Sequence, residues 1–444
     1  MHASVEYLYS LLRGWEVFKH LRQLEETQWL PHKEIQRLQL KKLRALVKHA
    51  YENVPFYRDN FKQAGIKPED IRRLTDIHKL PITTKDEMKA HVPNETIAGD
   101  YDIRALVKGG TGGTTGVPFI YYKDARTVHH ELAALHRFRS WYGFFEPKQT
   151  FLRLFPYYAP WSKEFKSFLM GWLICDRSQL TLSKYSQWAK RFNPRSLEGS
   201  PVAFYALAGF SKRAGHSELS LPVALSTSET LLDSHRQAIE SAFNCRVFNH
   251  YGCNEICTIA QECEERTGLH VNAEDRVVEF VKGGEVVAPG EAGEIVITDL
   301  ENYAMPFIRY NIKDVGVPTD DMCSCGRGLP LIDRILGRTG DLLISQKGTI
   351  VPSDVIAQFM LFKNQKWMQQ FQAVQPSRQE LLIRMVRSGA QSENLKLVQE
   401  MIRKQVGNAQ VETELVESIE APPSGKHRFA ISEESHRFFG QAKT

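Results

Sequence analysis

The stretch GGTGGTTGVP, residues 109–118, restricts the fold of this chain more than any other feature. Five glycines and three threonines follow the apolar residues 105–107, which indicates a short strand that runs into a loop almost without side chains. Bare backbone amides and threonine hydroxyls suit phosphate oxygens. The loop is not a Walker loop, because Val117 follows Gly116 where lysine is required, and not a dinucleotide fingerprint, because Thr115 replaces the third glycine. A flexible surface turn is the alternative interpretation.

Composition excludes several classes of protein. With 444 residues the chain has room for two or three domains, and its net charge of +5, without an arginine-rich run, argues against nucleic acid as a partner. Charged residues near the N-terminus argue against a signal peptide, and the longest candidate transmembrane segment, 168–175, is too short to span a bilayer. We therefore expect a cytoplasmic protein whose seven cysteines are thiols or metal ligands rather than disulfides.

The order of periodic segments predicts an α/β protein in two parts. Apolar residues at helical spacing predict a packing helix over 33–52, within a helical N-terminal segment of about 1–75. Strand-like pieces that alternate with helices predict a large α/β body of several subdomains over 1–337. After it, short strands and two helices predict a small α+β domain over 338–444.

Seven short motifs are spread over nearly the whole chain. They are NVPFYRDNF with LTDIHKLPITTKDEM, TGGTTGVP, STSE, YGCNE, PGEAGEIVITDLENYAMPFIRYNIKDVG, RILGRTGDLL and PPSGKHRF. In this order they resemble the motifs of the adenylate-forming ligases, specifically the phenylacetate-CoA ligase-like branch that includes capsular-polysaccharide-type relatives. The glycine-rich loop departs from the family pattern T-S-G-T-T-G-x-P only at Gly112, which replaces serine.

The resemblance implies an ATP-dependent, AMP-forming carboxylate ligase that makes an acyl-adenylate and transfers the acyl group to coenzyme A. Adenylation expels pyrophosphate as a carboxylate meets the α-phosphate, so the protein must position and neutralise two anions. The resemblance assigns Lys426 to the bridge between carboxylate and α-phosphate oxygens, and Glu255 to Mg²⁺. The residues alone also allow an exposed surface lysine and a carboxylate at a helix N-terminus.

The other implied positions contact the nucleotide. The loop would hold the β- and γ-phosphates, Ser228 and Glu229 would lie at the adenine wall, Tyr251 would offer adenine a flat face, and Asp314 would accept both ribose hydroxyls. A core tyrosine and a turn aspartate are the alternatives for the last two. The implied nucleotide set is Thr111, Gly112, Gly113, Thr114, Thr115, Gly116, Ser228, Glu229, Tyr251, Gly252, Asp314 and Arg338.

Two departures from the family pattern concern backbone positions. Gly340 stands at the hinge, where the family often has aspartate, and glycine can absorb the rotation that swings a mobile small domain. Lys313 replaces the glycine that usually precedes the ribose aspartate. We expect this lysine either to be harmless or to mark an altered nucleotide contact.

The cysteine spacing suggests a second metal site. Cys263 and His270 lie seven positions apart, and Cys323 and Cys325 form a C-x-C pair, together a candidate tetrahedral Zn²⁺ site. This spacing is not that of a standard zinc finger, but some relatives of the branch carry cysteines at these places. Reduced thiols in a loop are the alternative. The resemblance implies a structural role for zinc, closing a loop beside the nucleotide site.

Two other functions stay open at this point. The acyl group can pass to an amine or hydroxyl acceptor in polysaccharide or metabolite biosynthesis, or the chain can be an inactive nucleotide-binding homologue. The simultaneous presence of Lys426, Glu255 and Asp314 argues against the inactive homologue, because a decayed copy is free to lose them.

Overall fold

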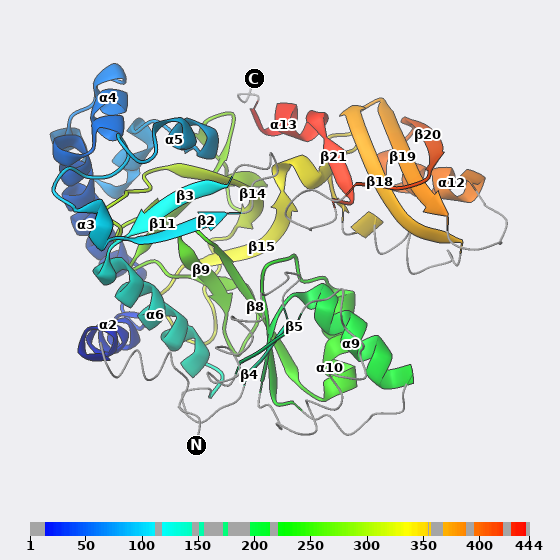
Figure 1. Cartoon of the computed structure of the whole chain (residues 1–444), viewed down its shortest axis with the longest axis horizontal. Helices are drawn as coiled ribbons and strands as arrows, with labels where there is room; N and C mark the ends of the chain where they lie inside the picture. Colours follow the sequence, from blue (N-terminus) through cyan, green and yellow to red (C-terminus); the bar gives the residue numbers. More distant parts are fainter. Residues whose placement is uncertain are drawn as a thin grey trace.

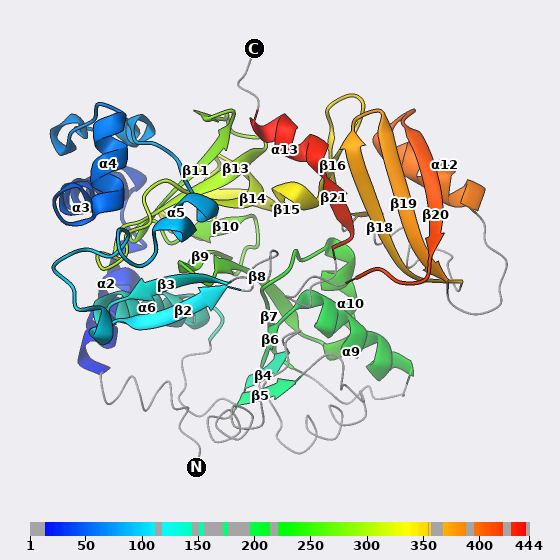
Figure 2. The same ribbon diagram turned by 45° about the horizontal axis from the view of Figure 1, so that its top comes forward.

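The computed structural model describes residues 14–111, 118–143, 151–154, 172–175, 196–213, 221–353, 355–356, 367–387, 395–420 and 428–440. The fold is mixed α/β, as the sequence predicts, with one large sheet, flanking helices and a separate C-terminal sheet (Figures 1 and 2). Within the described ranges, no helix combines the length and the apolar character needed to cross a lipid bilayer.

Three helices open the described chain: α2 (Gly14–Thr27), α3 (His32–Asn53) and α4 (Pro55–Gln63). The helix predicted over 33–52 is confirmed as α3, whose apolar stripe is buried in the main core. Pro55 begins α4 because the first helical position needs no N–H donor. Short elements follow: η1 (Pro68–Asp70), η2 (Leu74–Lys79), β1 (Thr83–Thr84), α5 (Lys85–His91) and η3 (Ile103–Ala105).

The large sheet has a parallel half and an antiparallel half. The parallel half runs β8 (Arg246–Cys253), β7 (Val223–Ser226), β6 (Ser196–Gly199), β4 (Phe151–Leu154) and β5 (Trp172–Cys175). The antiparallel half continues from β8 through β9 (Cys257–Glu262), β10 (Leu269–Val271), β15 (Leu331–Arg338), β14 (Tyr310–Pro318), β13 (Gly293–Asp299), β11 (Arg276–Lys282) and β12 (Glu285–Val286). The two-residue strand β1 adds to β14 in parallel.

Helices and a hairpin cover this sheet. In Figure 2, α9 (Pro201–Arg213) and α10 (Asp233–Phe243) lie together beside the parallel half, and their apolar residues share a core with β6, β7 and β8. The strands β2 (Val107–Thr111) and β3 (Phe119–Lys123) form an antiparallel hairpin around the glycine-rich loop. The helix α6 (Ala125–Ser140) follows, and the buried residues of α2 pack against it.

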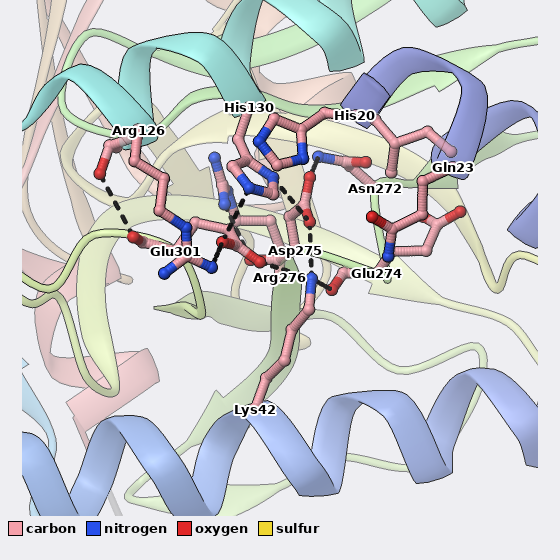
Figure 3. A network of polar contacts seen from close by, with 12 residues as sticks. His20, Gln23, Lys42, Arg126, His130, Asn272, Glu274, Asp275, Arg276 and Glu301 are labelled. Carbon is pink, nitrogen blue, oxygen red and sulfur yellow. Dashed lines mark hydrogen bonds and ion pairs between the residues drawn. The ribbon is translucent and has the colours of Figure 1, made fainter. Parts of the chain in front are cut away.

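A buried polar network ties α2, α3 and α6 to the start of β11 (Figure 3). The Lys42 Nζ lies 3.0 Å from Asp275 Oδ1 and 2.5 Å from Glu301 Oε1. The His130 Nε2 lies 3.2 Å from Glu301 Oε2, and the His130 ring contacts the His20 ring in a tilted arrangement with centroids 3.6 Å apart. His130, Asp275 and Glu301 are close enough to hold a metal ion, but the Lys42 ammonium already lies between the two carboxylates, so the cluster is an internal ion network.

The C-terminal part has its own core. A short pair, β16 (Leu342–Ile344) and β17 (Ile350–Pro352), precedes a four-stranded sheet. That sheet runs in the order β20 (Gln410–Val416), β19 (Glu380–Arg387), β18 (Met368–Ser377) and β21 (Ala430–Ser432), with α12 (Leu395–Val406) against it. The last helix, α13 (Glu433–Gly440), returns to the large sheet, where the Gly283 N–H donates to the Phe439 carbonyl at 2.8 Å.

Candidate active site

Three residues predicted to bind the nucleotide come together at the junction of β8, β14 and β15. The Tyr251 hydroxyl, near the end of β8, donates to Asp314 Oδ2 at 2.9 Å. Asp314 on β14 pairs in register with Arg338 on β15, whose Nε lies 3.9 Å from Asp314 Oδ1. Burial and the Asp314 carboxylate raise the pKa of Tyr251 well above its usual range, so its hydroxyl keeps its proton. The carboxylate is therefore held between a phenol and a guanidinium.

Glu255 follows β8 and is buried. Its Oε1 accepts a hydrogen bond from the Tyr310 hydroxyl at 3.2 Å. Burial and the Glu255 carboxylate raise the pKa of Tyr310, so this phenol is a donor throughout the physiological range. A carboxylate oriented in this way is a suitable ligand for a hard cation such as Mg²⁺.

Thr111 ends β2 and is the one phosphate-loop position within the described ranges; 112–116 lie outside them, as does Lys426. The side chain of Thr111 is buried, and its Oγ1 accepts a hydrogen bond from Lys85 Nζ at 2.6 Å. The same ammonium lies 3.5 Å from Glu255 Oε1. Lys85 thus connects the start of the glycine-rich loop to the predicted magnesium ligand.

Sequence reasoning missed Lys85. Lys85 lies within the motif LTDIHKLPITTKDEM, for which no site residue was predicted, and the structure shows it as the first residue of α5, with Thr84 as the N-cap. Thr83 and Thr84 pair with Tyr310 and Asn311 on β14, which brings the first residue of α5 to the glycine-rich loop. The available signal was indirect: a phosphate loop without a lysine requires a cation from another segment.

Ser228 and Glu229 lie two and three residues after the end of β7, at the carboxyl edge of the parallel strands, where ligands of parallel sheets bind. Ser228 has a left-handed φ of 74°, and the Glu229 carboxylate accepts a hydrogen bond from the Ser200 hydroxyl. Gly252 is explained by chain packing, because a Cβ there would lie 2.0 Å from the Cys257 carbonyl oxygen.

The two departures from the family pattern have structural explanations. Lys313 adopts a φ of 63°, and its Nζ lies 3.3 Å from Glu294 Oε1, so the ammonium pairs with β13. Gly340 lies against the C-terminal part, because a Cβ there would be 2.9 Å from both Arg428 and His436. The Arg428 Nε donates to Asp341 Oδ1 at 2.7 Å.

The four residues predicted as a zinc site also converge. Their ligand atoms all lie within 4.8 Å of one another, with 3.6 Å between the sulfurs of Cys263 and Cys323 and 3.4 Å between Cys325 Sγ and His270 Nε2. The other imidazole nitrogen, Nδ1, lies 3.3 Å from the Leu329 carbonyl, as in the second shell of many metal sites.

Two of the four residues have pKa values that favour the protonation state in which they bind a metal. Burial lowers the pKa of His270 to about 4, which keeps the imidazole neutral. Burial opposes ionisation of Cys323, but hydrogen bonds, first that from Thr267, outweigh it and lower its pKa. Burial raises the pKa of Cys263 to about 12, so this thiol requires a bound cation to ionise. Three sulfurs and one imidazole are the donor set of tetrahedral Zn²⁺.

Comparison with known proteins finds relatives that match most of the chain. Residues 343–433 match the family described as the CapK C-terminal domain. Over 354 residues the chain is 30% identical to the phenylacetate-coenzyme A ligase of Thermus thermophilus, covering 75% of this chain and 76% of the relative. The CapK protein of Staphylococcus aureus is 26% identical over 419 residues, 89% of this chain and 88% of that protein.

Among solved structures, 2-hydroxyisobutyryl-CoA ligase in its postadenylation state shares the fold. Its TM-score is 0.70 at 19% identity, over 92% of each chain. The similarity of sequence and of fold extends over both parts of the molecule. The chain belongs to the phenylacetate-CoA ligase family of adenylate-forming enzymes.

Proposed function

We propose that this chain is an ATP-dependent, AMP-forming ligase that joins a carboxylic acid to coenzyme A. In the first half-reaction a carboxylate oxygen attacks the α-phosphorus of ATP, and the bond to pyrophosphate breaks. In the second, the coenzyme A thiolate attacks the acyl carbonyl and AMP leaves with the carboxylate oxygen–phosphorus bond intact. The observation that carries the proposal is the Tyr251–Asp314–Arg338 group beside Glu255 and the start of the glycine-rich loop.

Within this reaction, Asp314 accepts hydrogen bonds from the ribose hydroxyls, and Tyr251 and Arg338 hold its carboxylate in place. Gly112–Gly116 supply amides and hydroxyls to the β- and γ-phosphates. Lys426 places its charge on the carboxylate and α-phosphate oxygens, where two anions must meet. Ser228 and Glu229 line the adenine side.

Glu255 would hold Mg²⁺. Its buried carboxylate accepts a hydrogen bond from Tyr310, and the Lys85 ammonium lies between this carboxylate and the Thr111 hydroxyl. Carboxylate oxygens are ligands that Mg²⁺ prefers. When bound, Mg²⁺ supplies positive charge for the phosphate oxygens. The residues of this chain hold and orient the nucleotide.

Zn²⁺ would occupy the group of Cys263, His270, Cys323 and Cys325. The group closes the loop between β9 and β10 onto the segment before β15, so its role is structural. The domain division at 338, with Gly340 as the hinge for residues 338–444, belongs to the same proposal, and the CapK C-terminal domain match over 343–433 supports it. We place the reaction in the cytoplasm, because its substrates are ATP and coenzyme A and no disulfide joins the six cysteines with described side chains.

A second candidate is an adenylating ligase that passes the acyl group to an amine or hydroxyl. It rests on the resemblance to capsular-polysaccharide-type relatives, and the CapK protein matches 89% of this chain. The test supplies the acyl-adenylate directly and follows AMP release with coenzyme A, with amines and with hydroxyl acceptors. Release that depends on coenzyme A supports the leading proposal, whereas release only with an amine or hydroxyl selects the alternative.

A further inference from the structure

Lys85 provides a cation beside a phosphate loop that has none of its own. The ten residues GGTGGTTGVP contain neither lysine nor arginine. The Lys85 Nζ donates to Thr111 Oγ1 at 2.6 Å, lies 3.5 Å from Glu255 Oε1 and sits 5.6 Å above the Phe119 ring centroid. With about a third of its side chain exposed (35%), the ammonium is accessible to a ligand from solvent.

The backbone of Lys85 is fixed from two sides. The preceding Thr83 pairs with Tyr310, and its N–H donates to the Arg309 carbonyl at 2.9 Å. Thr84 caps α5: its hydroxyl accepts from the Glu87 N–H at 3.3 Å, and its own N–H donates to Glu87 Oε2 at 2.8 Å. The strand β14 therefore positions both groups that contact Glu255 Oε1, the Tyr310 hydroxyl and the Lys85 ammonium.

This arrangement places a monovalent cation where a divalent one would bind. Under the proposed function Mg²⁺ would bind the Glu255 carboxylate, and two cations at one carboxylate oxygen repel each other. The lysine side chain has a flexible four-carbon stem and three rotatable donors, so it can leave the carboxylate while its backbone stays fixed. The nearest new anions would be the phosphate oxygens of the nucleotide.

We propose that, in the nucleotide-free protein, the Lys85 ammonium occupies the place beside Glu255 where Mg²⁺ would bind. When Mg²⁺ and ATP bind, the ammonium moves to the β- and γ-phosphates of ATP. The inference rests on the proposed function, because it takes ATP as the ligand. Lys85 then has two opposite effects: it weakens metal binding without nucleotide, and it strengthens binding of ligands that carry β- and γ-phosphates. Lys85 does not affect the binding of AMP, which lacks these phosphates.

The test compares wild-type protein with Lys85→Ala, using three probes: Mn²⁺ alone by electron paramagnetic resonance, and pyrophosphate in EDTA and AMP by calorimetry. Loss of one charged hydrogen bond predicts about 10- to 100-fold weaker pyrophosphate binding in the variant. Release of Glu255 from a partly exposed ion pair predicts roughly threefold tighter Mn²⁺ binding. AMP affinity is expected to stay unchanged, and Lys85→Arg is expected to restore most of the pyrophosphate affinity.

The matched control is Lys108→Ala, which removes an exposed lysine from β2. It is expected to leave all three affinities as in wild type. Equal weakening of AMP and pyrophosphate in Lys85→Ala would mean a structural role, and unchanged pyrophosphate or unchanged Mn²⁺ binding would overturn the proposal. A wild-type protein that binds neither AMP nor ATP would instead overturn the proposed function, and the proposal for Lys85 with it.

Discussion

The hydroxyl of Tyr251 donates a hydrogen bond to the carboxylate of Asp314 across 2.9 Å, linking the end of β8 to the middle of β14. On the other side, Arg338 contributes a guanidinium 3.9 Å from the same carboxylate. This contact brings together two residues that the sequence places 63 positions apart, in separate motifs.

Removal of either partner should weaken AMP binding. Tyr251→Phe deletes one hydrogen bond to Asp314 and is expected to reduce AMP affinity by about 2- to 10-fold, while Asp314→Ala, which removes the ribose acceptor, should cost roughly 10- to 100-fold. Calorimetric titration with AMP measures both. Tyr303→Phe is the control, because its ring packs on His49 instead. Unchanged AMP affinity in Asp314→Ala would remove this residue from the nucleotide site.

Lys426 should separate the two half-reactions. Lys426→Ala is expected to reduce adenylation by about 10²- to 10³-fold, the effect of losing one preorganised donor at a developing charge, and to spare acyl transfer from a supplied adenylate. Single-turnover assays of each half-reaction measure the difference. Lys404→Ala, at an exposed lysine of α12, is the control. Equal loss in both half-reactions would contradict the assigned role.

Zinc should stabilise the fold through the Cys263 group. Elemental analysis is expected to find equimolar zinc, and Cys323→Ser to lose it and lower the Tm, because binding free energy of a structural metal is folding free energy. Met322→Ala, at the exposed neighbouring position, should retain both zinc and Tm. If the wild-type protein contains no zinc as purified and its Tm equals that of Cys323→Ser, these residues are ordinary thiols.

Acid should destabilise the protein partly through His20. Burial, first, and the nearby His130 lower the pKa of His20 to about 4, against an ordinary value of 6.5. Between these values the unfolded chain binds a proton that the folded protein does not, so stability falls as the pH drops from about 6.5 towards 4. Above pH 6.5 this group contributes no pH dependence.

Urea unfolding at pH 7 and pH 5 tests this prediction. His20→Gln should lose less stability between the two pH values than wild type, whereas Gln23→Ala, at an exposed position of α2 without a titratable group, should match wild type. His136, whose pKa burial also lowers to about 4, contributes equally in all three proteins. An unchanged pH dependence in His20→Gln would show that burial beside His130 does not keep the proton off His20.

Features that depend on nearby residues were predictable from the sequence. The apolar stripe that includes Ile35 and Leu46 lies within one helix, so its spacing alone predicts α3. Two groupings of distant residues were also predicted, because the family resemblance gave each set one role: Tyr251, Asp314 and Arg338 at the nucleotide, and the three cysteines with His270 at a metal.

Distant contacts of residues to which no motif assigned a role were not predictable. Lys85 reaches the glycine-rich loop only because the two-residue strand β1 pairs with β14, and two residues carry no periodic signal. The Lys42 contacts with Asp275 and Glu301 likewise join α3 to segments far along the chain, through long side chains whose partners local pattern does not specify.

The most direct test of the account is ATP–pyrophosphate exchange by the purified protein with Mg²⁺ and pools of aryl, fatty and amino acids. Adenylation predicts that labelled pyrophosphate enters ATP with at least one acid, and only when that acid is present. Absence of exchange with every pool, in protein that binds ATP, would contradict an adenylating enzyme and favour a nucleotide-binding homologue without activity.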